Sequence, residues 1–94
     1  MEDREVVIVA GARTAMTNYG SHFTNVAMFK LGATVIKEAL KRAGLTPEQV
    51  EYVFFGHVMT DTTTPNVGRQ SLLHAGLPVT VPATTIDHQC GSSL

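Results

Sequence analysis

The sequence contains a single cysteine, Cys90, among its 94 residues. One cysteine excludes a disulfide within the chain and suits a reducing compartment, so we expect a cytoplasmic protein. Charge is also scarce, since seven Lys and Arg stand against eight Asp and Glu, a formal net charge of −1. Without a basic excess, the chain lacks the electrostatic pattern of a nucleic-acid-binding protein. The composition is that of an ordinary soluble domain and argues against a membrane protein.

Motifs for bound cofactors and metals are missing as well. The loop after the first apolar run reads GART at residues 11–14 and lacks the G-x-G-x-x-G spacing of a dinucleotide site. No H-x₃-H or C-x₂-C spacing occurs, so no metal site is predicted among the four histidines His22, His57, His74 and His88. We therefore expect no permanently bound cofactor. The charged start at residues 1–5 also lacks the pattern of a secretory signal or a transit peptide.

What is present is an alternation of apolar runs and amphipathic stretches. Residues 5–10 form a near-continuous apolar, β-branched run, which is typical of a central parallel strand. Helical spacing of apolar residues predicts a helix over residues 26–43, and a second, shorter helix is predicted over residues 65–74. Further strands are predicted at residues 52–58 and 84–86. The sequence thus predicts an α/β fold in the order strand–helix–strand–helix–strand, with parallel strands and right-handed crossovers.

The ends of the first helix carry their own signals. Asn25 is a candidate N-cap, and Gly44 is placed to be the C′ residue. Glu38 and Arg42 are four residues apart and can form a pair on the solvent side. Residues 46–49 read as a helix start with room for only one turn before the next strand.

Cys90 is the residue of greatest chemical interest. The residues after it, Gly91, Ser92 and Ser93, are small, so another backbone or a substrate can approach closely. If a helix begins at Cys90, its free backbone N–H groups favour the nucleophilic thiolate by about 0.3–1 kcal/mol. Strand, sharp turn, nucleophile and helix form the arrangement of a nucleophile elbow. The alternative is an inert buried cysteine, the commonest role of a lone Cys.

Four motifs in this chain resemble those of the thiolase family. IDHQCGSSL at residues 86–94 is similar to the thiolase active-site segment, which usually reads VNxxCGSGL. VIVAGART at residues 7–14 resembles the opening strand and Arg-Thr loop, and LGATVIKEAL at residues 31–40 resembles the first helix. NVGRQ at residues 66–70 and AGLP at residues 75–78 resemble the second helix and its exit. The motifs stand in family order along the whole chain.

The resemblance implies the layered αβαβα thiolase fold, with residues 1–94 as the N-terminal segment of its N-terminal domain. It also implies an acyltransferase of fatty acid metabolism that acts on coenzyme A thioesters, by thiolysis of 3-oxoacyl-CoA or by Claisen condensation of acetyl-CoA. Cys90 would hold the acyl group as a covalent intermediate. In the family, a histidine and a second cysteine from the C-terminal half complete the site. The implied partners are acyl-CoA and coenzyme A, and the implied assembly is a homo-oligomer, a dimer or tetramer.

Two other functions stay open at this point. A related condensing enzyme, such as a ketoacyl synthase, uses the same cysteine elbow with different partner residues. A non-enzymatic alternative is an incomplete fragment that only pairs with a complementary chain.

Four polar residues have both a structural and a functional interpretation. His57, at the end of the second predicted strand, is interpreted as a hydrogen-bonded structural residue, with an active-site role as the alternative. Arg69 is interpreted as an ion-pair or carbonyl-capping residue rather than an acyl-CoA ligand. Asp87 replaces the asparagine of many thiolases and either raises the thiol pKa or is held by loop hydrogen bonds. His88 lies two residues before Cys90 but need not reach the sulfur, so it is not predicted as the base.

Overall fold

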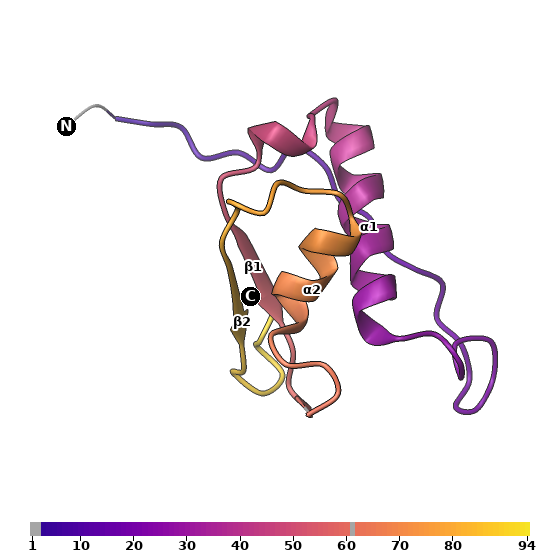
Figure 1. The fold of residues 1–94 in the computed structure, drawn as a ribbon. Coiled ribbons are helices and arrows are strands. Elements are labelled where there is room, and N and C mark those ends of the chain that lie inside the picture. The colour runs from indigo at the N-terminus through magenta and orange to yellow at the C-terminus, as the bar shows by residue number, and fades with distance from the viewer. Residues whose placement is uncertain (1–2, 61) are drawn as a thin grey trace.

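The computed structural model describes residues 3–60 and 62–94. Two helices and a two-stranded sheet form its folded part, as Figure 1 shows. In chain order, the elements are α1 (Met28–Ala43), the single 3₁₀ turn η1 (Pro47–Gln49), β1 (Val53–Gly56), α2 (Val67–His74) and β2 (Ala83–Ile86). The α/β class predicted from the sequence is confirmed. No helix in the described ranges is long and apolar enough to cross a bilayer.

The sheet is a strand–helix–strand unit in which α2 joins two parallel strands. The register places Val53 opposite Ala83 and Gly56 opposite Ile86. Helix α2 packs against both strands and also against α1. Because both helices lie on the same side of the sheet, no described helix covers its other face, and Phe54 is 71% exposed there.

The start of α2 is tied directly to β2. Asn66 caps the helix, and its side-chain oxygen accepts from the Arg69 amide at 3.1 Å. The Thr85 hydroxyl donates to the same Asn66 oxygen at 2.6 Å and accepts from the Gly68 amide at 3.1 Å. These bonds satisfy amides that a helix start leaves without partners. The buried core consists of small and aliphatic side chains: Ala33, Leu72, Ala75, Leu77 and Val81.

Helix α1 begins later than predicted, and the prediction of Asn25 as its cap is wrong. The helix starts at Met28, and its N-cap is Ala27, which makes no side-chain capping bond. Asn25 lies in the preceding turn, in which the Val26 amide bonds the Phe23 carbonyl at 3.1 Å. Asn25 therefore lies two residues before the N-cap position. Only a side chain at the N-cap can reach the first free amides of the helix.

The C-terminal end of α1 confirms its predicted signals. Gly44 adopts the left-handed conformation with φ 69°, and its amide bonds the Lys41 carbonyl at 3.2 Å. Glu38 and Arg42 form the predicted pair at 2.8 Å on the solvent side. Residues 46–49 also form the single turn that was expected, as the cap and body of η1.

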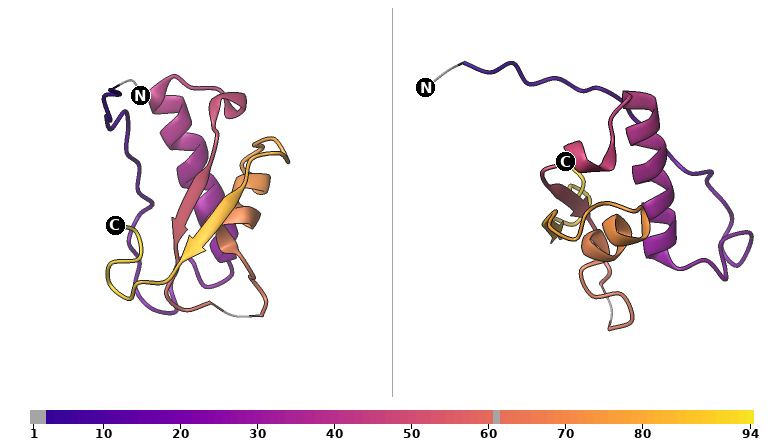
Figure 2. Two further views of the ribbon diagram at one scale, coloured as in Figure 1. Left: turned by 90° about the vertical axis from the view of Figure 1, so that its left-hand side faces the viewer. Right: turned by 45° about the horizontal axis from the view of Figure 1, so that its top comes forward.

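The strand predicted at residues 5–10 does not form. This segment is extended but unpaired, and Val6 and Ile8 are 95% and 97% exposed. Figure 1 and the right-hand view of Figure 2 show it leading away from the folded part. An apolar β-branched run forms a strand only where a neighbour supplies hydrogen-bonding groups, and the described sheet holds β1 and β2 alone. The predicted order of parallel strands therefore lacks its first strand in the described sheet, and the second strand, predicted at residues 52–58, is shorter, at Val53–Gly56.

Candidate active site around Cys90

Cys90 lies four residues beyond the end of β2, at the carboxyl end of the parallel strands. Its thiol is free and exposed, so the alternative of a buried cysteine does not hold. His57 directly follows β1 at the same end of the sheet. In α/β folds this end is where ligands and reactive side chains gather. The position of Cys90 is therefore suited to a nucleophile.

The helix predicted to begin at Cys90 is absent from the described residues. Three turn bonds replace it, from the Gly91 amide to the His88 carbonyl at 3.1 Å, from Ser92 to Gln89 at 3.1 Å and from Leu94 to Gly91 at 3.0 Å. Each bond spans three residues, one fewer than in an α-helix. The structure describes four residues after Cys90, and a segment of that length does not offset the cost of helix nucleation. The predicted stabilisation of the thiolate by a helix terminus thus has no basis in this structure.

Side chains on either side of Cys90 hold the turn in place. The Gln89 amide donates to Asp87 Oδ1 at 3.0 Å, which confirms the interpretation of Asp87 as a residue held by loop hydrogen bonds. The Ser92 hydroxyl accepts from the His88 amide at 2.9 Å and donates to the Gln89 carbonyl at 2.7 Å. Gln89 adopts a positive φ of 53°. The Cys90 amide donates none of the hydrogen bonds of this turn.

The turn rests on the end of β1 at Gly56. An ideal Cβ placed on Gly56 would lie 2.6 Å from the carbonyl carbon of Ser92, closer than real side chains approach. The small residues after Cys90 predicted that another backbone or a substrate could approach them closely. Their partner, Gly56, could not be identified from the sequence because it lies far away along the chain.

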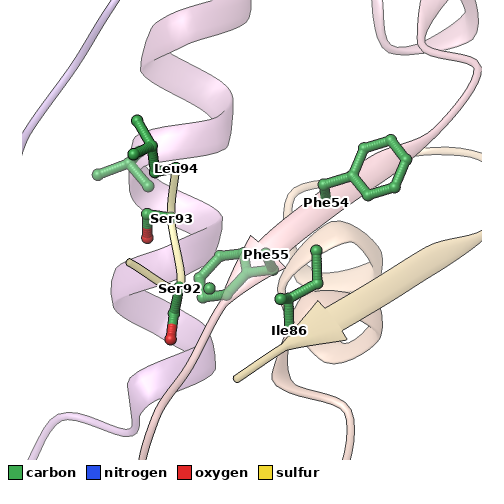
Figure 3. A pocket seen from close by; sticks show the side chains of 8 residues that line it. Phe54, Phe55, Ile86, Ser92, Ser93 and Leu94 are labelled. Carbon is green, nitrogen blue, oxygen red and sulfur yellow. The ribbon is translucent and has the colours of Figure 1, made fainter. Parts of the chain in front are cut away.

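An apolar cavity of about 600 Å³ opens between this turn, helix α1 and the carboxyl ends of β1 and β2 (Figure 3). Its lining consists of Val35, Phe54, Phe55, Gly56, Ile86, Ser92, Ser93 and Leu94. No titratable side chain lines it, and Cys90 is not part of the lining. The cavity is therefore an apolar packing surface beside the site rather than a pocket for the chemistry.

The part of the chain that is similar to known proteins includes Cys90 and the turn around it. Residues 6–94 match the family profile described as "Thiolase, N-terminal domain". The chain belongs to the thiolase family.

Individual thiolase-family relatives agree with this membership. A protein named acetyl-CoA acetyltransferase from Cupriavidus necator is 49% identical over 90 residues, which are 96% of this chain and 23% of that protein. A rat protein named "Acetyl-CoA acetyltransferase, cytosolic" is 45% identical over 89 residues, 95% of this chain and 22% of that protein. The chain thus spans about a quarter of the length of these relatives.

The fold agrees with a solved thiolase-family structure. The crystal structure of the Bacillus anthracis acetyl-CoA acetyltransferase superposes with a TM-score of 0.87 at 38% identity, over 92% of this chain and 22% of that one. The thiolase-type architecture predicted from the sequence is therefore confirmed.

Arg69 has a structural role in this thiolase segment. Its Nη1 donates to the Val81 carbonyl at 2.7 Å and its Nη2 to the Val79 carbonyl at 2.9 Å. Both carbonyls belong to the segment that leads into β2. The interpretation of Arg69 as a carbonyl-capping residue is confirmed.

The histidines of the site differ from what the sequence indicated. His57 was expected to be hydrogen-bonded, yet both of its ring nitrogens are closed to solvent and have no partner among the described residues. His88 is exposed, and within residues 3–60 and 62–94 no histidine ring is hydrogen-bonded to the Cys90 sulfur. The same part of the chain holds no group of three or more His, Cys, Asp and Glu residues placed to bind a metal ion. Cys90 thus stands without a base from this part of the protein.

Proposed function

We propose that this chain is the nucleophile-bearing segment of a thiolase-type acyltransferase, with Cys90 as its catalytic residue. The parent enzyme would cleave 3-oxoacyl-CoA by thiolysis or condense two molecules of acetyl-CoA. The observation that carries this proposal is an exposed cysteine at the carboxyl end of two parallel strands, inside a segment that matches thiolases over residues 6–94. Acetyl-CoA also appears in the names of both relatives.

In the condensation direction, the Cys90 thiolate attacks the carbonyl carbon of acetyl-CoA and forms a new carbon–sulfur bond. The tetrahedral oxyanion collapses, the bond to coenzyme A breaks, and the departing thiolate takes up a proton. The α-carbon of a second acetyl-CoA, after losing a proton, then attacks the acetyl group on Cys90 and displaces the cysteine thiolate. Thiolysis is the reverse sequence. Because the Cys90 amide donates no hydrogen bond within the turn, it is available to stabilise the oxyanion.

The reaction also needs a base for Cys90 and an acid/base group for the α-carbon. Following the family resemblance, we assign both to a histidine and a second cysteine in the C-terminal half of the parent enzyme. On this proposal, residues 1–94 are the N-terminal segment of the N-terminal domain. The exposed Val6, Ile8 and Phe54 favour a second candidate function, in which the chain alone is only an assembly piece that needs a complementary chain.

The proposal extends to assembly and compartment. The enzyme would be a cytoplasmic homo-oligomer, a dimer or tetramer, with coenzyme A thioesters as substrates and no permanently bound cofactor. One edge of β2 pairs with no strand of the described chain, which supports a subunit contact at residues 84–87. The name of the rat relative supports the compartment. Light scattering of the complete enzyme should give at least a dimer at micromolar concentration, and a monomer would contradict this assembly.

The covalent intermediate provides the direct test. The complete enzyme, incubated with acetyl-CoA and quenched in acid, should carry a hydroxylamine-labile acetyl group on the peptide that contains Cys90. Mass spectrometry locates the adduct, and the Cys90→Ala variant is the matched control because it removes the single cysteine of residues 1–94 and leaves the second cysteine of the parent enzyme in place. Turnover without acetylation of Cys90 would reject the proposed role.

A further inference from the structure

The hydrogen-bond ladder between β1 and β2 continues one residue beyond the strands. The His57 amide donates to the Ile86 carbonyl at 2.9 Å, and the Val53 amide donates to the Pro82 carbonyl at 3.0 Å in the same pattern. Since Val53 is paired with Ala83, the same offset places His57 opposite Asp87. Neighbouring strands lie about 4.8 Å apart, so the two side chains start from adjacent backbone positions.

Alternation along the strands places both residues on the helix side of the sheet. Thr85 faces α2, since its hydroxyl bonds the Gly68 amide, and an ideal Cβ on Gly68 would lie 2.8 Å from Phe55 Cβ. His57 and Asp87 each follow two residues later, so they share that face. A cross-strand pair of this kind is where side chains of adjacent strands interact.

Among the described residues, His57 has a ring N–H without an acceptor, and Asp87 has a carboxylate oxygen without a donor. Both ring nitrogens of His57 are closed to solvent without a partner in the described ranges, and a neutral or charged imidazole always carries at least one N–H donor. Sealing such a group without a partner is costly, so native structures rarely leave it so. The Asp87 carboxylate uses Oδ1 for the Gln89 amide, and its second oxygen accepts no hydrogen bond from the described residues.

We propose that the His57 ring donates a hydrogen bond to Asp87 and thereby fixes the turn that carries Cys90. In the structure described here the two groups are not bonded, so the proposed bond requires rotation of their side chains. His57 then holds Asp87, Asp87 holds the Gln89 amide, and Gln89 directly precedes Cys90. His57 is thus a positioning residue for the proposed acyl transfer, and this role rests on the proposed function.

With the bond from His57 to Asp87, the turn that carries Cys90 would be held from both faces of the sheet. On the other face of the sheet, the backbone of Ser92 already rests on Gly56, the residue before His57. The turn would then be fixed before Cys90 through Asp87 and after it through Ser92. One support comes from Gly56, the last residue of β1, and the other from His57, which directly follows it. Such fixation matters because small displacements of a reacting group lower rates strongly.

The kinetic test separates hydrogen bonding from packing at position 57 of the complete enzyme. His57→Leu fills similar space without a donor, whereas His57→Asn keeps an N–H donor. We expect His57→Leu to lower kcat about tenfold with little change in KM, and His57→Asn to stay within about threefold of the parent. The exposed loop residue His22 gives the control His22→Leu, which should leave both constants unchanged. A larger loss for His57→Asn than for His57→Leu would show a packing role and overturn the proposal.

Non-additivity identifies Asp87 as the partner. If His57 acts through Asp87, the double variant His57→Leu/Asp87→Ala should be no slower than Asp87→Ala alone. Multiplied losses would show that the two residues act independently and would contradict the pair.

A spectroscopic measurement keeps the test independent of catalysis. With ¹⁵N-labelled histidine, the hydrogen-bonded His57 ring N–H should be slow to exchange, and Asp87→Asn should shift its resonance while Asp3→Asn does not. Absence of that shift overturns the pair even if Cys90 is acetylated as proposed. Conversely, an enzyme in which the shift occurs but Cys90 is never acetylated keeps the pair and rejects the proposed function.

Discussion

The backbone of Ser92 occupies the space into which a side chain on Gly56 would project, with only 2.6 Å between an ideal Cβ and the Ser92 carbonyl carbon. This contact joins the end of β1 to the turn that carries Cys90. It makes Gly56 the residue whose replacement should disturb the site most directly, because an added Cβ would also meet the Ser92 carbonyl oxygen and the Ser93 hydroxyl.

Gly56→Ala should lower the free energy of unfolding by about 1–3 kcal/mol, because the added methyl group displaces the Ser92 backbone. Urea denaturation followed by circular dichroism measures the change. Gly11→Ala is the control, since nothing lies within 4 Å of its ideal Cβ. Equal stability of the two variants would mean that the turn does not rest on Gly56.

Asn66→Ala should destabilise the chain by about 1–2 kcal/mol through loss of the α2 cap and of the bond from Thr85. The control is Asn25→Ala, at a residue that the sequence indicated as a cap but that caps nothing in the structure. This variant should change the unfolding midpoint little. A larger effect at Asn25 than at Asn66 would contradict the observed caps.

Arg69→Met should cost about 2 kcal/mol, because the charged donor satisfies two carbonyls that lead into β2. Arg42→Met removes a guanidinium whose two bonds, to Glu38 and to the Gly11 carbonyl, are both exposed, and should cost about 0.5 kcal/mol. Thermal unfolding of both variants gives the comparison. Similar melting temperatures would show that the carbonyl bonds of Arg69 contribute no more than a surface pair.

Cys90 in the isolated chain should react with iodoacetamide at neutral pH within about threefold of the rate of glutathione, since no helix begins at this exposed thiol. The complete enzyme, with its partner residues in place, should react faster. Mass spectrometry of the modified peptide gives both rates. A strongly accelerated reaction in the isolated chain would show that these residues activate the thiol by themselves.

The isolated chain should not catalyse thiolysis of acetoacetyl-CoA. Groups that act as a catalytic unit are strongly non-additive, so a nucleophile without its base loses nearly all of the rate. The decrease in absorbance of acetoacetyl-CoA is the measurement, with Cys90→Ala as the blank. Turnover above this blank would mean that the chain supplies its own base, and His88 would be the first residue to replace.

What could be predicted from the sequence depends on how far apart the interacting residues are. The C-terminal signals of α1 were correct because Gly44 and the Glu38–Arg42 pair involve neighbours within one helical turn. The loop bond of Asp87 is similarly local, to Gln89. The prediction of Asn25 as the N-cap was wrong because the turn before α1 extends two residues further, so the N-cap is Ala27.

Interactions between distant parts of the chain set the limit of the sequence analysis. The run at residues 5–10 has strand-forming residues, but its pairing depends on neighbours that local pattern does not show. The helix expected at Cys90 likewise needs further helical residues after its first turn, because these offset the cost of nucleation. The position of Cys90 at the carboxyl end of the sheet was predictable, whereas the contact of Gly56 with Ser92 and the sealed ring of His57 required coordinates.

The unpaired run at residues 5–10 also has a consequence during synthesis. A ribosome makes this segment before β1, and 43 residues, numbered 10 to 52, separate Val9 from the start of β1 at Val53. During that interval the nascent chain presents a flat, β-branched stretch without any strand to receive it, and Val6 and Ile8 stay exposed even in the folded chain. Such stretches pair readily with one another between molecules. A chaperone that binds residues 5–10 would therefore protect the nascent chain from such pairing until β1 has been made.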